Sequence, residues 1–194
     1  MLTEEGKKRR AARDAEIAER VAAFKIEQRE LLRELAEVGV VVDMVNLLSS
    51  RTTAENPRSM PILMKHLRRD YSEGTLASLA AALATKEAGK YWDELVSMYR
   101  NSADRTPTGP GNFVMALAAA VSAACPPGRI YDLIELLRDR RLPDRVILLT
   151  PLKKRRGRDP AIAQVINELR HDPELSKEIG SWKILKSQEV PRTH

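Results

Sequence analysis

The hexapeptide LMKHLR at residues 63–68 is an apolar stretch that ends in arginine, and the chain repeats this pattern three more times. The later copies are LVSMYR (95–100), LIELLR (133–138) and VINELR (165–170), so the matched arginines are 32, 38 and 32 residues apart. Each copy is followed by a turn and a second apolar stretch predicted to be helical, at 76–83, 113–124, 146–152 and 175–185. A period in the thirties with two helices per unit is typical of an α-solenoid.

The turns between the stretches support this count. Asp159-Pro160, Asp172-Pro173 and Pro143-Asp144 place a proline where a helix can begin. The longer middle spacing has its cause in residues 101–112, which contain the sequence TPTGPG. We expect this segment to be a loop insertion at one edge of the stack.

The units LMKHLRRDYSEGTLASLAAAL (63–83) and VINELRHDPELSKEIGSWKI (165–184) resemble HEAT repeats. The resemblance covers roughly residues 58–185. It implies an all-α fold, a right-handed α-solenoid of about four HEAT-like helical hairpins, whose surface binds protein or, less often, nucleic acid. The final residues, 186–194, are expected to be a C-terminal tail.

The N-terminal segment, residues 1–38, is predicted to be one long amphipathic helix from about Thr3 to Ala36. Apolar residues recur in it in alternating steps of four and three, with Gln28 as the polar member. We expect this seam to pack on the rest of the chain, and a homodimer through the N-terminal helix is the alternative. For residues 39–57 we predict that Gly39 ends the long helix, that a short helix spans Val40 to Leu48, and that a polar connector follows. The candidate seam consists of Ile17, Val21, Phe24, Leu31 and Leu35.

Composition restricts the class of protein. The 194 residues are 43% hydrophobic but only 4% aromatic, which suits closely packed helices rich in Leu and Ala. A single cysteine excludes an intramolecular disulfide framework, so we expect a reducing, cytoplasmic location. The apolar stretch Phe113 to Cys125 is too short for a membrane span, and no membrane association is predicted.

No constellation for catalysis stands out. His66, His171 and His194 do not form a metal-binding or catalytic spacing, and we expect His66 and His171 at helix C-termini, where a partly charged imidazole is favoured. Cys125 is predicted to follow a helix, where the helix dipole opposes a thiolate. We therefore expect no cofactor and no metal, and an enzyme only in the second of the two hypotheses below.

The net charge of +6 is concentrated between residues 138 and 158, which carry nine basic and two acidic residues. Such a run attracts phosphate groups or an acidic partner, although a solvated helix end gives the same pattern. The candidate contacts are Arg138, Arg140, Arg141, Arg145, Lys153, Lys154, Arg155, Arg156 and Arg158.

Two functional hypotheses follow. The first is a non-catalytic scaffold or adaptor that recognises a protein partner through the row of second helices, near residues 72–78, 112–115, 145–153 and 176–183. The second is a nucleic-acid-binding HEAT-like protein that uses the basic 138–158 region. A family of DNA glycosylases uses a HEAT-like stack, and Asp132, Asp139 or Asp144 would be the candidate aspartate in that case.

Overall fold

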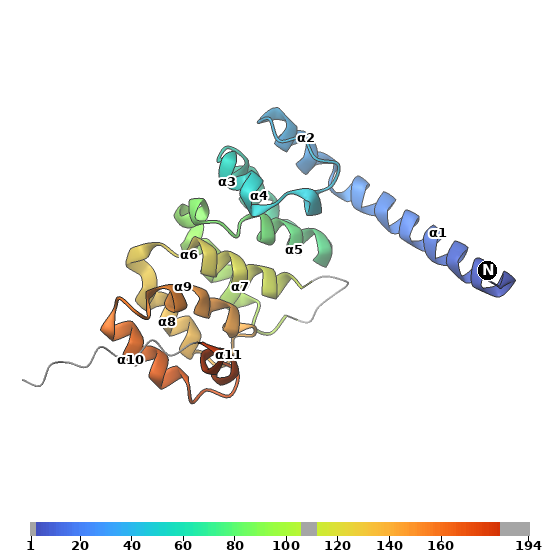
Figure 1. Ribbon diagram of the computed structural model, residues 1–194. Helices are drawn as coiled ribbons and strands as arrows, with labels where there is room; N and C mark the ends of the chain where they lie inside the picture. Colours follow the sequence, from blue (N-terminus) through green and yellow to red (C-terminus); the bar gives the residue numbers. More distant parts are fainter. Residues whose placement is uncertain (1–2, 106–111, 183–194) are drawn as a thin grey trace, which may run out of the picture.

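The computed structural model describes residues 3–105 and 112–182, and every regular element in these ranges is helical (Figure 1). The predicted all-α class is therefore confirmed. The α-helices, in chain order, are α1 (Glu4–Glu27), α2 (Arg29–Glu37), α3 (Ser50–Glu55), α4 (Ser59–Leu67), α5 (Glu73–Ala82), α6 (Trp92–Asn101), α7 (Phe113–Ala124), α8 (Ile130–Arg138), α9 (Thr150–Arg155), α10 (Pro160–Leu169) and α11 (Ser176–Ser181). Short 3-10 helices are η1 (Val45–Leu47), η2 (Lys86–Tyr91), η3 (Pro127–Arg129) and η4 (Arg145–Leu149).

The N-terminal helix extends away from the other helices and then bends at Gln28 (Figure 1). The predicted single helix from Thr3 to Ala36 is thus wrong in one respect, because the chain forms α1 and α2 with a break between them. Gln28 is only 4% exposed, and its side chain donates to Thr75 Oγ1 and accepts from the Val45 backbone N–H, both at 2.9 Å. Glu27, the last residue of α1, also accepts from the Ser72 hydroxyl at 2.8 Å and from the Thr75 hydroxyl at 2.7 Å, so Gln28 and Glu27 together tie this bend to the body of the protein.

Gly39 ends α2, as predicted, in a Schellman motif. The Gly39 N–H bonds to the Ala36 carbonyl at 3.0 Å, and the Val40 N–H bonds to the Leu35 carbonyl at 2.9 Å. Gly39 has φ of 87°, a left-handed conformation that glycine adopts without steric cost.

Residues 40–57 differ from the prediction in two ways. The predicted helix from Val40 to Leu48 is reduced to the 3-10 helix η1, although Val40, Val45 and Leu48 are all buried. The predicted connector contains the helix α3, whose N-cap Ser49 accepts from the Thr52 N–H at 3.1 Å. A serine cap supplies the partner that the first helical turn needs.

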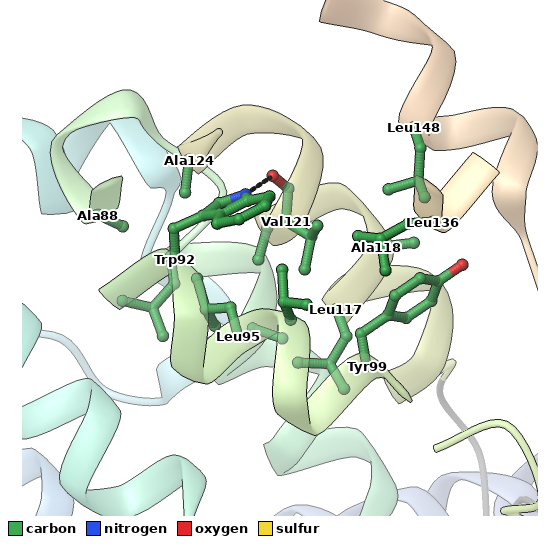
Figure 2. Packing of buried hydrophobic residues seen from close by; sticks show 14 of the residues in the cluster. Ala88, Trp92, Leu95, Tyr99, Leu117, Ala118, Val121, Ala124, Leu136 and Leu148 are labelled. Carbon is green, nitrogen blue, oxygen red and sulfur yellow. Dashed lines mark hydrogen bonds between the residues drawn. The ribbon is translucent and has the colours of Figure 1, made fainter. Parts of the chain in front are cut away.

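Helix α7 lies at the centre of the molecule and packs against α5, α6, η2, η4 and α9. Its sequence, FVMALAAAVSAA, allows this because alanine side chains let neighbouring helices approach closely. On the α6 side, the Trp92 indole N–H donates to the Val121 carbonyl at 3.0 Å (Figure 2). Tyr99, about two turns further along α6, is buried and donates its hydroxyl to the Pro143 carbonyl.

The predicted helix over 146–152 is divided into η4 and α9. Pro151 has no N–H with which to bond the Ile147 carbonyl, which disfavours one continuous α-helix there. The Ile147 carbonyl instead accepts from the Ser122 hydroxyl of α7 at 3.0 Å. The last predicted helix is α11, and residues 183–185 of that prediction lie outside the described residues, as do residues 106–111 of the predicted loop insertion and the tail 186–194.

Ion pairs join helices that are adjacent in the order α2, α4, α6, α8 and α10. Arg69 of the α4 end pairs with Glu30 on α2 at 2.5 Å, and Arg68 pairs with Glu94 on α6 at 2.5 Å. Further along, Arg138 on α8 pairs with Glu168 on α10 at 2.9 Å. Arg68 and Arg138 are two of the four matched arginines, so the arginine in the sequence pattern contacts the next unit of the chain in both cases. Arg129, directly before α8, pairs back to Asp93 of α6 at 2.7 Å.

Within the described ranges, no single helix has the length and apolar character needed to cross a membrane. Helix α7 together with η3 and α8 is long and apolar enough for a span, but the chain bends by 114° between them. Most of α7 is buried inside the protein, as its role at the centre of the core requires.

Candidate interaction surfaces

The basic region at 138–158 forms two separate groups of side chains. In the first group, around the end of α8, each arginine has an acidic partner: Arg138 pairs with Glu168, Arg140 with Asp172 at 3.1 Å, and Arg141 with Asp139 at 2.8 Å. The Arg141 guanidinium lowers the pKa of Asp139 to about 2. These arginines are matched by carboxylates and do not make an uncompensated positive patch.

Arg145 is in the interior, where it cannot reach a binding partner. Only 3% of the residue is exposed. Its guanidinium donates to the Leu137 carbonyl at 2.7 Å, to Asp172 at 3.0 Å and to Glu174 at 2.9 Å. Burial acts to raise the pKa of Asp172, but the hydrogen bonds from Arg145 and from backbone N–H groups hold it below its usual value. Arg145 thus fixes the turn after α8 against the turn after α10.

The second group lies at the end of α9. Lys153 pairs with Glu178 of α11 at 3.1 Å, and Lys153 and Arg156 both lie over the Trp182 ring, at 5.2 and 5.4 Å from its centroid. Arg155 donates to the Pro127 carbonyl at 3.2 Å. Lys154 and Arg158 are exposed and form no ion pair among the described residues. Of the nine candidate contacts, Lys154 and Arg158 are therefore the ones with the freest charge.

A groove lies between α7 and α9, with a volume of about 430 Å³. Its floor consists of small or apolar side chains, and Lys154 and Arg155 stand on the α9 side. The adjoining stretches 74–85 and 112–128 contain no charged residue, and Met115 on α7 is 45% exposed. The groove is lined by Ala84, Ala119, Ser122, Ala123, Cys125, Ile147, Thr150, Pro151, Lys154 and Arg155.

Cys125 at the edge of this groove is half-buried, and burial raises the pKa of its thiol to about 11. The thiolate is therefore disfavoured, as the sequence indicated for different electrostatic reasons. The groove therefore provides a concave surface with two cations, Lys154 and Arg155, but its cysteine is not an activated nucleophile.

The predicted N-terminal seam is divided by the bend at Gln28. Downstream of it, Leu31 and Leu35 are fully buried against the body, as the packing hypothesis expects. Upstream, α1 has no buried residue: Val21 and Phe24 are half-buried and Ile17 is 40% exposed. The seam of α1 is thus a partly uncovered apolar stripe.

One cluster was not found from the sequence. Glu30 and Glu34, one turn apart on α2, meet His66 of α4, and these three side chains offer ligand atoms that lie within 4.8 Å of one another. Lys65 Nζ is 2.6 Å from Glu34, however, and Arg69 binds Glu30 with two hydrogen bonds. A metal ion would have to displace these two cations, so the arrangement fits an ion-pair network between helices better than a metal centre. The four-residue spacing of the two glutamates was the signal available in the sequence.

His66 lies at the end of α4, as predicted, but the expected charge is wrong. The side chain is completely buried, and this burial lowers its pKa, so the neutral imidazole is favoured. Its Nδ1 lies 2.7 Å from the Tyr71 hydroxyl and its Nε2 3.3 Å from Glu34.

The residues that a glycosylase would need do not converge. Asp132 pairs with Arg129 on the surface, Asp139 pairs with Arg141, and Asp144 is half-buried in a left-handed turn with φ of 56°. Burial raises the pKa of Asp144. Both tryptophans, Trp92 and Trp182, are buried and present no ring on which a base could stack.

Comparison with known proteins places no constraint on these surfaces. No family model matches the chain, and no curated protein and no solved structure gives a significant match to it.

Proposed function

We propose that the protein is a non-catalytic scaffold, an α-solenoid of HEAT-like helical hairpins, that binds an acidic segment of a protein partner. The hairpins would be α4 with α5, α6 with α7, α8 with η4 and α9, and α10 with α11. In support, the matched residues Arg68 and Arg138 each pair with the following hairpin's first helix, Glu94 and Glu168. A contact that recurs from unit to unit is what a stack of repeats requires.

The groove between α7 and α9 is the observation that carries the proposal. Its uncharged floor, with Ala119 and Ala123, gives an apolar side chain close access to the helix backbone. Lys154 and Arg155 on the α9 side supply positive charge for a flanking carboxylate. A partner segment with an apolar anchor next to acidic residues matches both features.

Nucleic-acid binding remains the second candidate because Lys154 and Arg158 are exposed and close in sequence. Strong duplex binding requires many simultaneous phosphate contacts. Arg145 is buried, and Arg138, Arg140 and Arg141 are matched by carboxylates, which leaves few cations for such contacts. The geometry therefore favours the acidic protein segment.

Affinity purification with the tagged full-length chain tests the proposal. We expect a protein to be recovered in stoichiometric amount, and two groove variants, A119F and K154E, to reduce its recovery at least tenfold. R51E, a charge reversal on α3 at an exposed arginine, should leave recovery unchanged. Recovery of nucleic acid alone, or equal losses for R51E and K154E, would refute the proposal.

A further inference from the structure

The groove between α7 and α9 holds two cations that no acidic side chain neutralises. Lys154 is exposed and Arg155 is half-buried, and neither forms an ion pair with another described residue. None of the residues that line this groove is acidic. The groove between α6 and α8 differs, because three acidic residues line it together with two arginines. The groove beside α9 therefore has positive charge available for an anion.

The spacing of residues along α9 explains why these two cations face the groove. Lys154 and Arg155 each follow another lining residue, Thr150 and Pro151, by four residues, so all four lie on one face of the helix. Lys153 lies on a different face, where it pairs with Glu178 of α11 at 3.1 Å. The basic run at the end of α9 is thus divided between two faces, and one of them belongs to the groove.

Two further features prepare this end of the groove for an anion. The Arg155 Nη1 donates to the Pro127 carbonyl of η3 at 3.2 Å, which fixes the guanidinium and leaves its other N–H groups for a ligand. Thr150 is exposed, and its hydroxyl makes no hydrogen bond to the rest of the described chain. Two cations and one hydroxyl donor therefore line the same end of the groove.

We propose that this end of the groove binds the phosphate monoester of a phosphorylated serine or threonine in the partner segment. The inference rests on the proposed function, because it assigns the anion that the acidic segment carries. A phosphate monoester has a charge of about −1.5 to −2 at pH 7, which matches two cations, whereas a carboxylate has a single charge. Its terminal oxygens accept from Lys154, from the Arg155 fork and from the Thr150 hydroxyl.

NMR titration of the full chain with three small probes tests the assignment. Phenyl phosphate is a monoester, methyl phenyl phosphate is a diester like the nucleic-acid backbone, and benzoate is a carboxylate, and all three carry the same apolar ring. We expect phenyl phosphate to shift the methyl signals of Ala119 and Ala123 and to bind at least tenfold more tightly than the other two. Its affinity should fall below about pH 6, where the monoester loses charge, whereas that of the diester should not change.

Three variants assign the contacts. K154M and R155M should each weaken phenyl phosphate binding at least tenfold, since each removes a hydrogen bond to a charged group. K153M removes the same charge from the other face of α9 and should leave the dissociation constant within about twofold of the wild-type value. The amide spectra of the variants should match that of the wild-type chain away from the groove, which separates lost binding from lost folding.

Each contrary result has a distinct meaning. Equal affinities for phenyl phosphate and benzoate would overturn the phosphate assignment and leave the acidic-segment proposal standing. Tighter binding of the diester would overturn it in favour of a nucleic-acid backbone. Shifts confined to other parts of the protein, or equal losses in K153M and K154M, would overturn the site. Failure of the proposed function is detected separately, because affinity purification would then recover no protein whatever the affinities of these probes.

Discussion

At the scale of single residues, Arg145 shows why a basic cluster in a sequence is not automatically a binding site. Its buried guanidinium pairs with Asp172 and Glu174 and so joins two turns that are far apart in the chain. Arg141, four residues earlier, belongs to the same basic run but is 86% exposed and pairs with Asp139. The difference in burial between Arg145 and Arg141, which cannot be read from the sequence, gives the two arginines different roles.

Replacing Arg145 by alanine should strongly destabilise the protein. The variant removes the buried partner of Asp172 and leaves only the exposed Arg140 beside it, and breaking a buried ion pair in this way costs about 3–5 kcal/mol. R141A removes an exposed pair and should cost at most about 1 kcal/mol. Urea unfolding of both variants measures the difference. Equal unfolding midpoints for R145A and R141A would show that Arg145 does not hold the two turns together.

His66 should make the stability depend on pH in mildly acidic solution. Its folded pKa lies below the ordinary value of 6.5, so the neutral form stabilises the fold above pH 6.5. Stability should fall as the pH drops from 6.5 toward the folded pKa, because the unfolded chain binds the proton first. The pKa of Glu34 is held below 4.5, chiefly by its hydrogen bond from Lys65. Protonation of Glu34 therefore reduces the stability of the protein only at a lower pH than protonation of His66 does.

The variant H66N checks this assignment. We expect its free energy of unfolding to change less between pH 6.5 and 5 than that of the wild-type chain, in a series of urea titrations. H171N, at an exposed histidine directly after the fourth matched arginine, serves as the control and should keep the wild-type slope. If the free energy of unfolding still falls between pH 6.5 and 5 in H66N but no longer does so in H171N, the buried imidazole of His66 does not cause the pH dependence.

At the scale of helices and turns, Gly39 determines where the chain leaves α2. An alanine there would have to adopt the left-handed conformation at φ of 87°, although its added carbon would meet no atom closer than 3.9 Å. The cost is therefore conformational, about 1–2 kcal/mol. Thermal unfolding should show this loss for G39A. G128A, where the added carbon meets open space, should change stability little, and an equal effect in both would contradict the proposed role of Gly39.

The sequence predicted most of the helices, because their apolar periodicity and turn residues are local signals. The predicted helix 113–124 coincides with α7, and the arginine-ended stretches 63–68, 95–100 and 165–170 lie at the ends of α4, α6 and α10. It failed where a long-range contact decides the backbone. Gln28 bends the N-terminal helix through bonds to Val45 and Thr75, which lie 17 and 47 residues away. Only the division at Pro151 had a local cause that the sequence displayed.

The surfaces were harder to predict than the helices, for the same reason. The grouping of Glu30 and Glu34 with His66 depends on α2 packing against α4. The groove between α7 and α9 depends on small residues such as Ala84 and Ala119 meeting Pro151 across helices. A sequence displays charge runs such as 153–158, but not which cations already have partners.

At the scale of the whole molecule, two rows of helices differ in how they are joined. Ion pairs connect α2, α4, α6, α8 and α10, whereas α5, α7 and α9 meet through small and apolar side chains centred on α7. The second row carries the uncharged stretches 74–85 and 112–128. Our central claim is that this row, at the groove beside α9, is the surface that receives the protein partner.

Site-specific photo-crosslinking tests that claim most directly. A photoreactive amino acid at Ala123, in the groove, should cross-link to one protein, and mass spectrometry should place the cross-link in a segment with acidic residues beside an apolar anchor. The same probe at Ser97, an exposed position on α6 in the other row, should give no such product. Cross-linking of that protein from Ser97 but not from Ala123, or of nucleic acid alone from Ala123, would contradict the account.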